Sequence, residues 1–100
     1  MEFSVNVLGR PVKVLVDPQR MLQEGTHGSY EYPIGGEATI HLAKPHDGTT
    51  LFHEMLHALS EFLELELTEQ QVRGLELGVP LMFKENPGLW ASLMGPAKDA

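Results

Sequence analysis

The hydrophobic pattern of this chain changes its period once, near Thr49, and that change limits the fold more than any other feature. Before it, residues 3–8 and 37–43 alternate apolar and polar side chains, and residues 12–16 are rich in valine. Such segments are typical of β-strands. After it, large apolar residues recur at helical spacing from about 50 to 65. Strands followed by helices indicate an α+β domain, here a small, mainly antiparallel sheet packed on a helix.

One or two further helices are expected to follow. Thr68 and Gln71 have the spacing of a capping box, which predicts a helix start at Thr68. Gly78 and Pro80 threaten its continuity, so this helix is expected to end near residue 77, with a second short helix after it. Its inner face is predicted to consist of Val72, Leu75, Val79 and Met82.

Two other segments carry weaker signals. Residues 19–29 contain Gly25 and Gly28, so a loop is favoured there over a short helical turn. A last apolar cluster is expected to pack back on the domain, and it comprises Leu89, Trp90, Leu93 and Met94.

Length and composition exclude several classes of protein. A chain of 100 residues forms one domain, residues 1–100, with a modest core. The absence of cysteine excludes disulfides, thiolate zinc sites and cysteine nucleophiles. The net charge of −7 makes nucleic acid an improbable partner. No apolar run approaches the roughly 18 residues of a membrane span, and the start lacks a signal-peptide pattern. We therefore expect a cytoplasmic protein without a membrane partner; its oligomeric state is not predicted.

The chemistry-bearing feature is the H-E-x-x-H run of residues 53–57, inside the first predicted helix. Two histidines four positions apart stand one turn apart on one helix face, so the imidazoles of His53 and His57 can converge on one ion. Imidazole suits zinc, and two such ligands with a third leave a position for water. Glu54 lies about 100° around the helix from His53, so it can take a proton from that water. A chance match in a chain of this composition has a probability of only about 3%.

The sequence resembles the zincin metallopeptidases over about residues 37–76, through ATIHL, TTLFHEMLHALSEFL and TEQQVRGLE. The resemblance implies that His53 and His57 bind Zn²⁺, that Glu54 is the general base and that residues 38–42 form an edge strand aligning a peptide or protein substrate. The metzincin branch needs Gly and His where this chain has Ser60 and Leu63. The chain therefore resembles a very small gluzincin that lacks the large substrate-binding domain of that group. In gluzincins the third zinc ligand is a glutamate on a following helix.

Glu69 is the favoured third ligand. It lies in the first turn of the second helix, three residues before the inward Val72, where a tight reversal would turn it toward the first helix. A glutamate at a helix start is also favourable without any metal. Glu76 is the next candidate, although it can simply pair with Arg73, and His41 or His46 are further alternatives. Glu61, Glu64 and Glu66 come too soon in the chain.

Other polar residues favour structural interpretations. Tyr30 and Tyr32 can act as oxyanion donors, but tyrosine in a strand is ordinarily packed, and His27 is expected in a loop. The overall prediction is a zinc-dependent metallopeptidase. The alternative is a non-catalytic metal-binding or regulatory interaction module, in which a fourth protein ligand closes the site. A metal-dependent nuclease is disfavoured by the acidic balance.

Overall fold

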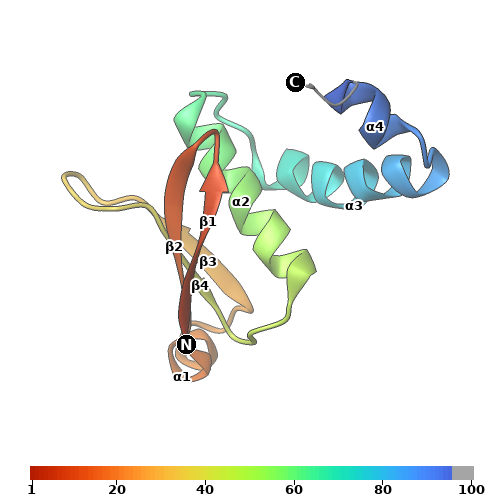
Figure 1. Ribbon diagram of the computed structural model, residues 1–100. Helices are drawn as coiled ribbons and strands as arrows, with labels where there is room; N and C mark the ends of the chain where they lie inside the picture. The colour runs from red at the N-terminus through yellow and green to blue at the C-terminus, as the bar shows by residue number, and fades with distance from the viewer. Residues whose placement is uncertain (96–100) are drawn as a thin grey trace.

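The computed structural model describes residues 1–95 and has the α+β architecture predicted from the change of period (Figure 1). None of the helices in this described part is long and apolar enough to cross a membrane. In chain order the elements are β1 (Glu2–Val7), β2 (Arg10–Val16), α1 (Pro18–Glu24), β3 (Gly28–Glu31), β4 (Thr39–Leu42), α2 (Gly48–Phe62), α3 (Glu69–Glu85) and α4 (Leu89–Met94).

The four strands form one sheet in the order β1-β2-β4-β3. β1 and β2 make an antiparallel hairpin, in which Val7 pairs with Arg10 across a two-residue turn. β2 and β4 pair in parallel, and β3 and β4 pair antiparallel. The sheet is therefore mixed, because the chain crosses over through α1 and β3 before it adds β4 beside β2.

The strand order corrects one expectation from the resemblance. Residues 38–42 do not form an edge strand, because β4 is hydrogen-bonded to β2 on one side and to β3 on the other. The edge strand next to β4 is β3, which pairs with β4 alone among the described strands.

The core lies between one face of the sheet and α2. Alternate residues of the two central strands are fully or almost fully buried, and they are Val12, Val14, Ile40 and Leu42. α2 packs on them with one apolar stripe, made of Leu51, Met55, Ala58, Leu59 and Phe62. Each large side chain buried in this way contributes about 1.5–3 kcal/mol, so the burial fixes which face of α2 turns away from the sheet.

Two local predictions are wrong for identifiable reasons. Residues 18–24 form α1, because the Asp17 side chain accepts a hydrogen bond from the backbone N–H of Arg20 and Met21 is completely buried. Gly25 adopts a left-handed conformation (φ 69°) that ends this helix. α3 does not end near residue 77 but continues through Pro80 to Glu85. Solvent can satisfy the carbonyl that Pro80 leaves unpaired, since this part of α3 is exposed.

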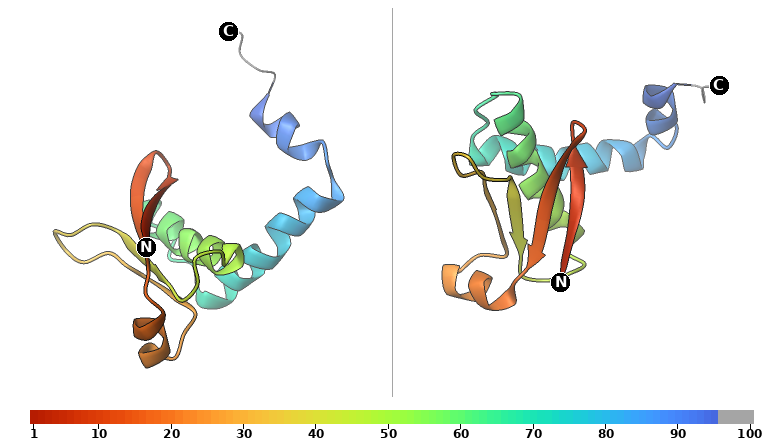
Figure 2. Two further views of the ribbon diagram at one scale, coloured as in Figure 1. Left: turned by 60° about the horizontal axis from the view of Figure 1, so that its bottom comes forward. Right: turned by 60° about the vertical axis from the view of Figure 1, so that its left-hand side comes forward.

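The last third of the chain leaves the body of the domain. Of the inner face predicted for α3, only Val72 is buried, whereas Leu75 and Met82 are exposed. α4 has no buried residue, so its apolar cluster does not pack back on the domain. Figure 2 shows α3 extending past α2, with α4 turned at its far end. The radius of gyration is accordingly 15.1 Å, against about 13 Å for a compact chain of this length.

Gly28 lets the edge strand approach the first long helix. A Cβ at this position would lie 2.5 Å from Thr50 Cγ2, 3.3 Å from the carbonyl oxygen of His41 and 3.4 Å from Glu54 Cγ. Thr50 cannot easily move aside, because its backbone N–H and its hydroxyl both donate to the Asp47 carboxylate that caps α2. The backbone of β3 therefore packs directly on side chains of α2, with no side chain of β3 between them at this position.

We expect Gly28→Ala to lower the free energy of unfolding by about 1–3 kcal/mol, because the added methyl group overpacks this contact. Gly74→Ala is the matched control. Gly74 lies within α3 with open space around its Cβ position, so alanine should raise stability by about 0.5–1 kcal/mol. Urea denaturation followed by circular dichroism measures both, and equal effects of the two substitutions would contradict this role of Gly28.

Candidate metal centre

α2 supplies the first two side chains of the candidate centre. Asp47 caps α2, and the apolar stripe of this helix packs on the sheet. His53 and His57 fall on a flank of the helix, where their side chains are 15% and 26% exposed. The two rings meet edge to face with centroids 4.9 Å apart. The one-turn spacing seen in the sequence thus produces two adjacent imidazoles that share one open side.

A short reversal brings α3 to that open side. The backbone N–H of Leu67 donates to Ser60 Oγ at 2.9 Å, which fastens the connecting loop to α2. Thr68 then caps α3 in the capping box predicted from the sequence, with Gln71 as its partner. Glu69 therefore occupies the first turn of α3, and Val72 anchors the same end of the helix in the core.

Three donor atoms converge between α2 and α3. Nitrogen or oxygen atoms of His53, His57 and Glu69 all lie within 4.8 Å of one another. The two Nε2 atoms are 3.2 Å apart, and Glu69 oxygens lie 2.6 Å from His53 Nε2 and 3.1 Å from His57 Nε2. Two ligands of a tetrahedral zinc ion, at about 2.0–2.1 Å from it, are roughly 3.3 Å apart. The donor set and its spacing therefore fit a zinc ion after small side-chain adjustments.

The ring of His53 has a carboxylate at each of its two nitrogens. Glu76 Oε1 lies 2.5 Å from its Nδ1, while Glu69 Oε1 lies 2.6 Å from its Nε2. A neutral imidazole has only one N–H, so one of the two carboxylates faces a ring lone pair unless the ring is protonated or a metal binds. If Nδ1 donates to Glu76, Nε2 is left to bind a cation. Glu76 thus lies where it can orient a ligand, as carboxylates beside metal-binding histidines do.

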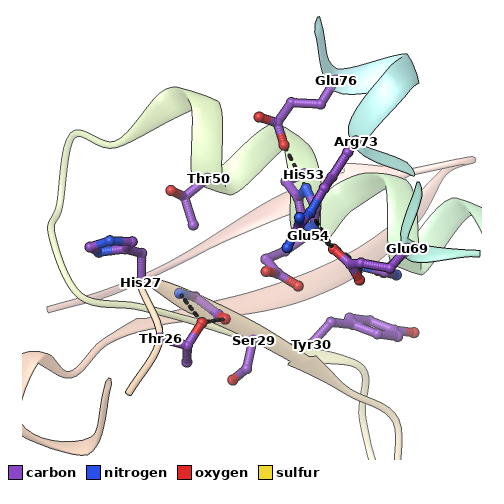
Figure 3. Close-up of a pocket in the computed structure, with 12 residues that line it drawn as sticks. Thr26, His27, Ser29, Tyr30, Thr50, His53, Glu54, Glu69, Arg73 and Glu76 are labelled. Carbon is purple, nitrogen blue, oxygen red and sulfur yellow. Dashed lines mark hydrogen bonds and ion pairs between the residues drawn. The ribbon is translucent and has the colours of Figure 1, made fainter. Parts of the chain in front are cut away.

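Glu54 lies beside this group but faces the sheet. Its residue is only 6% exposed, and its carboxyl group points into the space between α2 and β3 (Figure 3). Burial raises its pKa to about 7; the charge of His53 opposes this shift, and Glu69 and Glu76 reinforce it. A carboxyl group with this pKa can both accept and release a proton near neutral pH.

The pocket in front of these residues has a volume of about 550 Å³. One wall is α2 with the start of α3, and the other is the edge strand with the residues before it, Thr26–Tyr30. Nothing in the sequence pattern marks Thr26 or Ser29 as lining residues, because it does not show that β3 lies beside α2. Arg73 of α3 lines the pocket as well and was not predicted to do so. Arg73 lies one turn along α3 from Glu69, 3.7 Å from its carboxylate.

Tyr30 is close to the site, whereas Tyr32 is not. Tyr30 lines the pocket, and its buried hydroxyl has no hydrogen-bond partner among the described residues. Burial raises its pKa to about 12, so the hydroxyl remains a donor. In Figure 3 the ring passes beneath Glu69 and its hydroxyl points away from Glu54. Tyr32 instead packs edge to face on Phe62 and accepts a hydrogen bond from Arg10.

The remaining histidines occupy other places. His41 is 3% exposed and pairs through Nε2 with Glu31 at 2.9 Å, and its buried Nδ1 has no hydrogen-bond partner within residues 1–95. It is not among the residues that line the pocket, and neither is His46, which lies in the exposed turn before α2. Neither is therefore the third member of the cluster. His27, expected in a loop, does line the pocket, beside Thr50.

Comparisons with protein-family models, with curated proteins and with solved structures find no match for this chain.

The raised pKa of Glu54 predicts a pH dependence of stability in the metal-free protein. A pKa of about 7 against an ordinary value of 4.5 means that the folded state holds this proton more tightly. Its contribution to stability is complete below about pH 4.5 and is lost as the pH rises through about 7. Glu54→Gln stays neutral, so we expect this variant to exceed wild type by roughly 1–3 kcal/mol near pH 8 and to equal it near pH 4.

Chemical denaturation in the presence of a chelator, measured across this pH range, tests the expectation. Glu61→Gln removes an exposed carboxylate from the same helix and serves as the control. If the difference in free energy of unfolding between wild type and Glu54→Gln does not change with pH, the pKa of Glu54 is not raised in the folded protein.

Proposed function

We propose that this protein is a zinc-dependent metallopeptidase that hydrolyses peptide bonds with Glu54 as the general base. The proposal rests chiefly on one observation: His53, His57 and Glu69 converge from two helices at the side of a pocket that also contains a buried carboxyl group. This agrees with the resemblance of the H-E-x-x-H segment to zincins, and with Glu69 as the third ligand.

The residues of the pocket divide the chemistry between them. His53, His57 and Glu69 would hold the ion, and Glu76 would orient His53. Bound zinc would polarise the scissile carbonyl and lower the pKa of a water molecule toward about 7. The Glu54 carboxylate accepts a proton from the attacking water and then delivers it to the nitrogen of the leaving amine. In the metal-free protein burial raises the pKa of Glu54 to about 7. The positive charge of a bound ion would lower this pKa and so favour the carboxylate form that accepts the first proton.

The substrate would lie along β3 rather than along residues 38–42. β3 uses one edge to pair with β4, and residues 26–30 form a wall of the pocket. An extended peptide can add to such a free edge through backbone hydrogen bonds. Its scissile bond would then cross the pocket in front of Glu54. An unfolded segment or short peptide suits this open edge best, since a folded protein rarely offers an extended strand.

The alternative is a non-catalytic module whose metal site is structural. Structural zinc sites are closed by four protein ligands, whereas catalytic sites keep one position for water. Within residues 1–95 the cluster contains three side chains, and a pocket opens beside them. This count favours the catalytic function.

Zinc binding is the first test. We expect one zinc ion per chain, with stoichiometric binding lost in His57→Ala and in Glu69→Ala, because each removes a ligand. Glu76→Gln should keep the zinc with an affinity about 10–100-fold lower, since it disturbs only the orientation of His53. Glu61→Gln should bind as wild type does. Competition with a chromophoric chelator measures the affinities, and anomalous diffraction at the zinc edge counts the ligands. Unchanged binding by Glu69→Ala would exclude Glu69.

Hydrolysis is the second test. Wild-type protein loaded with zinc should cleave members of a quenched fluorescent peptide library, and Glu54→Gln should lower the rate by about 10²–10⁴-fold while it keeps its zinc. Full activity in Glu54→Gln would overturn the role of Glu54. A zinc-loaded wild type with four protein ligands and no cleavage would instead establish the structural alternative.

A further inference from the structure

The C-terminal arm, defined as residues 77–95, has an apolar surface that the domain does not cover. The arm comprises the second half of α3 and all of α4, and neither part contains a buried residue. The large apolar side chains left exposed are Leu77 at 74%, Leu81 at 46%, Met82 at 53%, Trp90 at 59%, Leu93 at 62% and Met94 at 60%. A helix that is apolar on several faces is normally buried, so this arm is missing a neighbour.

The arm is held as a defined shape and is not a loose tail. Phe83 near the end of α3 and Trp90 in α4 pack edge to face, with ring centroids 5.4 Å apart. Asn86 accompanies the turn, and its side chain donates to the carbonyl oxygen of Met82. Figures 1 and 2 show the resulting bend, which lies well away from the sheet. The arm therefore presents its apolar side chains in a fixed arrangement.

The exposed area matches what a stable dimer requires. An aromatic side chain presents roughly 150–250 Å² when fully exposed, and leucine and methionine lie in the lower part of that range. The six side chains at 46–74% exposure therefore offer roughly 600–800 Å². Each partner in a standard protein interface contributes about 800 Å². Two arms of this size can thus cover each other without help from the rest of the domain.

The distribution of charge selects the kind of partner. Residues 1–76 contain five Lys and Arg side chains against twelve Asp and Glu side chains, so the whole net charge of −7 lies in the body. The arm contains only Lys84 and Glu85 and is neutral. A single lysine does not provide the basic face of a membrane-surface helix, and the acidic body repels anionic lipid and nucleic acid. A second arm is neutral, so contact between two arms brings no like charges together at the interface.

We propose that the C-terminal arm is the interface of a homodimer, in which the apolar faces of α3 and α4 from two copies pack against each other about a two-fold axis. In such an isologous contact the same patch is used twice, and Trp90 is the aromatic anchor of the kind that dominates interface energetics. The inference is independent of the proposed metal chemistry, since none of the arm residues lines the pocket in front of Glu54.

Sedimentation equilibrium of the full chain, from about micromolar concentration upward, tests the proposal. The expected mass is twice the monomer mass of 11.1 kDa. Leu81→Glu and Trp90→Glu should each raise the dimer dissociation constant by at least about 10-fold. Neither side chain is buried in one copy. Leu81 takes no part in the Phe83–Trp90 packing or in the Asn86 hydrogen bond that holds the bend, so the far-ultraviolet circular dichroism of Leu81→Glu should match wild type, and this variant is the decisive one. Leu22→Glu, which adds the same charge at an 81% exposed leucine of α1, should leave the dimer intact.

Trp90 also provides a direct readout, because it is the one tryptophan of the chain. Dilution of the wild-type protein should shift its fluorescence emission to longer wavelength as the dimer dissociates. An 11.1 kDa monomer throughout the range would overturn the proposal and assign the arm to another partner. A dimer that survives in both arm variants would overturn it as well, by placing the interface elsewhere.

Discussion

Burial of one stripe of α2 on the sheet is the constraint from which the rest of the site follows. Leu51, Met55 and Phe62 pack against the buried core. This packing fixes the rotation of the helix and leaves His53 and His57 on its flank, at the pocket that β3 also lines. The same contact brings β3 close through Gly28. A buried carboxyl group, two imidazoles and a free strand edge thus come together because one helix packs in one orientation.

The charges around this flank link the metal to the docking of α3. Glu69 and Glu76 face the two nitrogens of one imidazole, and Glu54 lies nearby in a poorly solvated position. Without a cation, these three carboxylates repel one another. α3 is otherwise anchored by a single fully buried residue, Val72. Under the proposed function, the ion would therefore contribute to folding as well as to chemistry, since binding free energy adds to the stability of the docked helix.

Local rules account for the parts that could be predicted. The convergence of residues 53–57 is a property of any α-helix, and the capping box placed the start of α3, which made Glu69 a reasonable candidate. The contact of Glu76 with His53 depends on the distance between two helices, which spacing along one helix does not give. The prediction that residues 38–42 form an edge strand was wrong, because the order of strands along the sequence does not determine their order in the sheet. Gly25 and Pro80 were treated as residues that prevent a helix. Gly25 in fact ends helix α1, and α3 continues through the exposed Pro80, where solvent can satisfy the carbonyl left without a donor.

The position of Val72 has a mechanical consequence for the rest of α3. It lies three residues, or about 4.5 Å of helical rise, from Glu69, and thirteen residues, or about 20 Å, from the far end at Glu85. A small tilt of the helix about this pivot displaces its far end roughly four times as much as the carboxylate at its near end. Bending or crowding at the tip of the helix is therefore damped before it reaches the imidazoles. Under the two proposals, a neighbour could bind at one end of α3 while the contact of Glu69 with the two imidazoles at the other end moves much less.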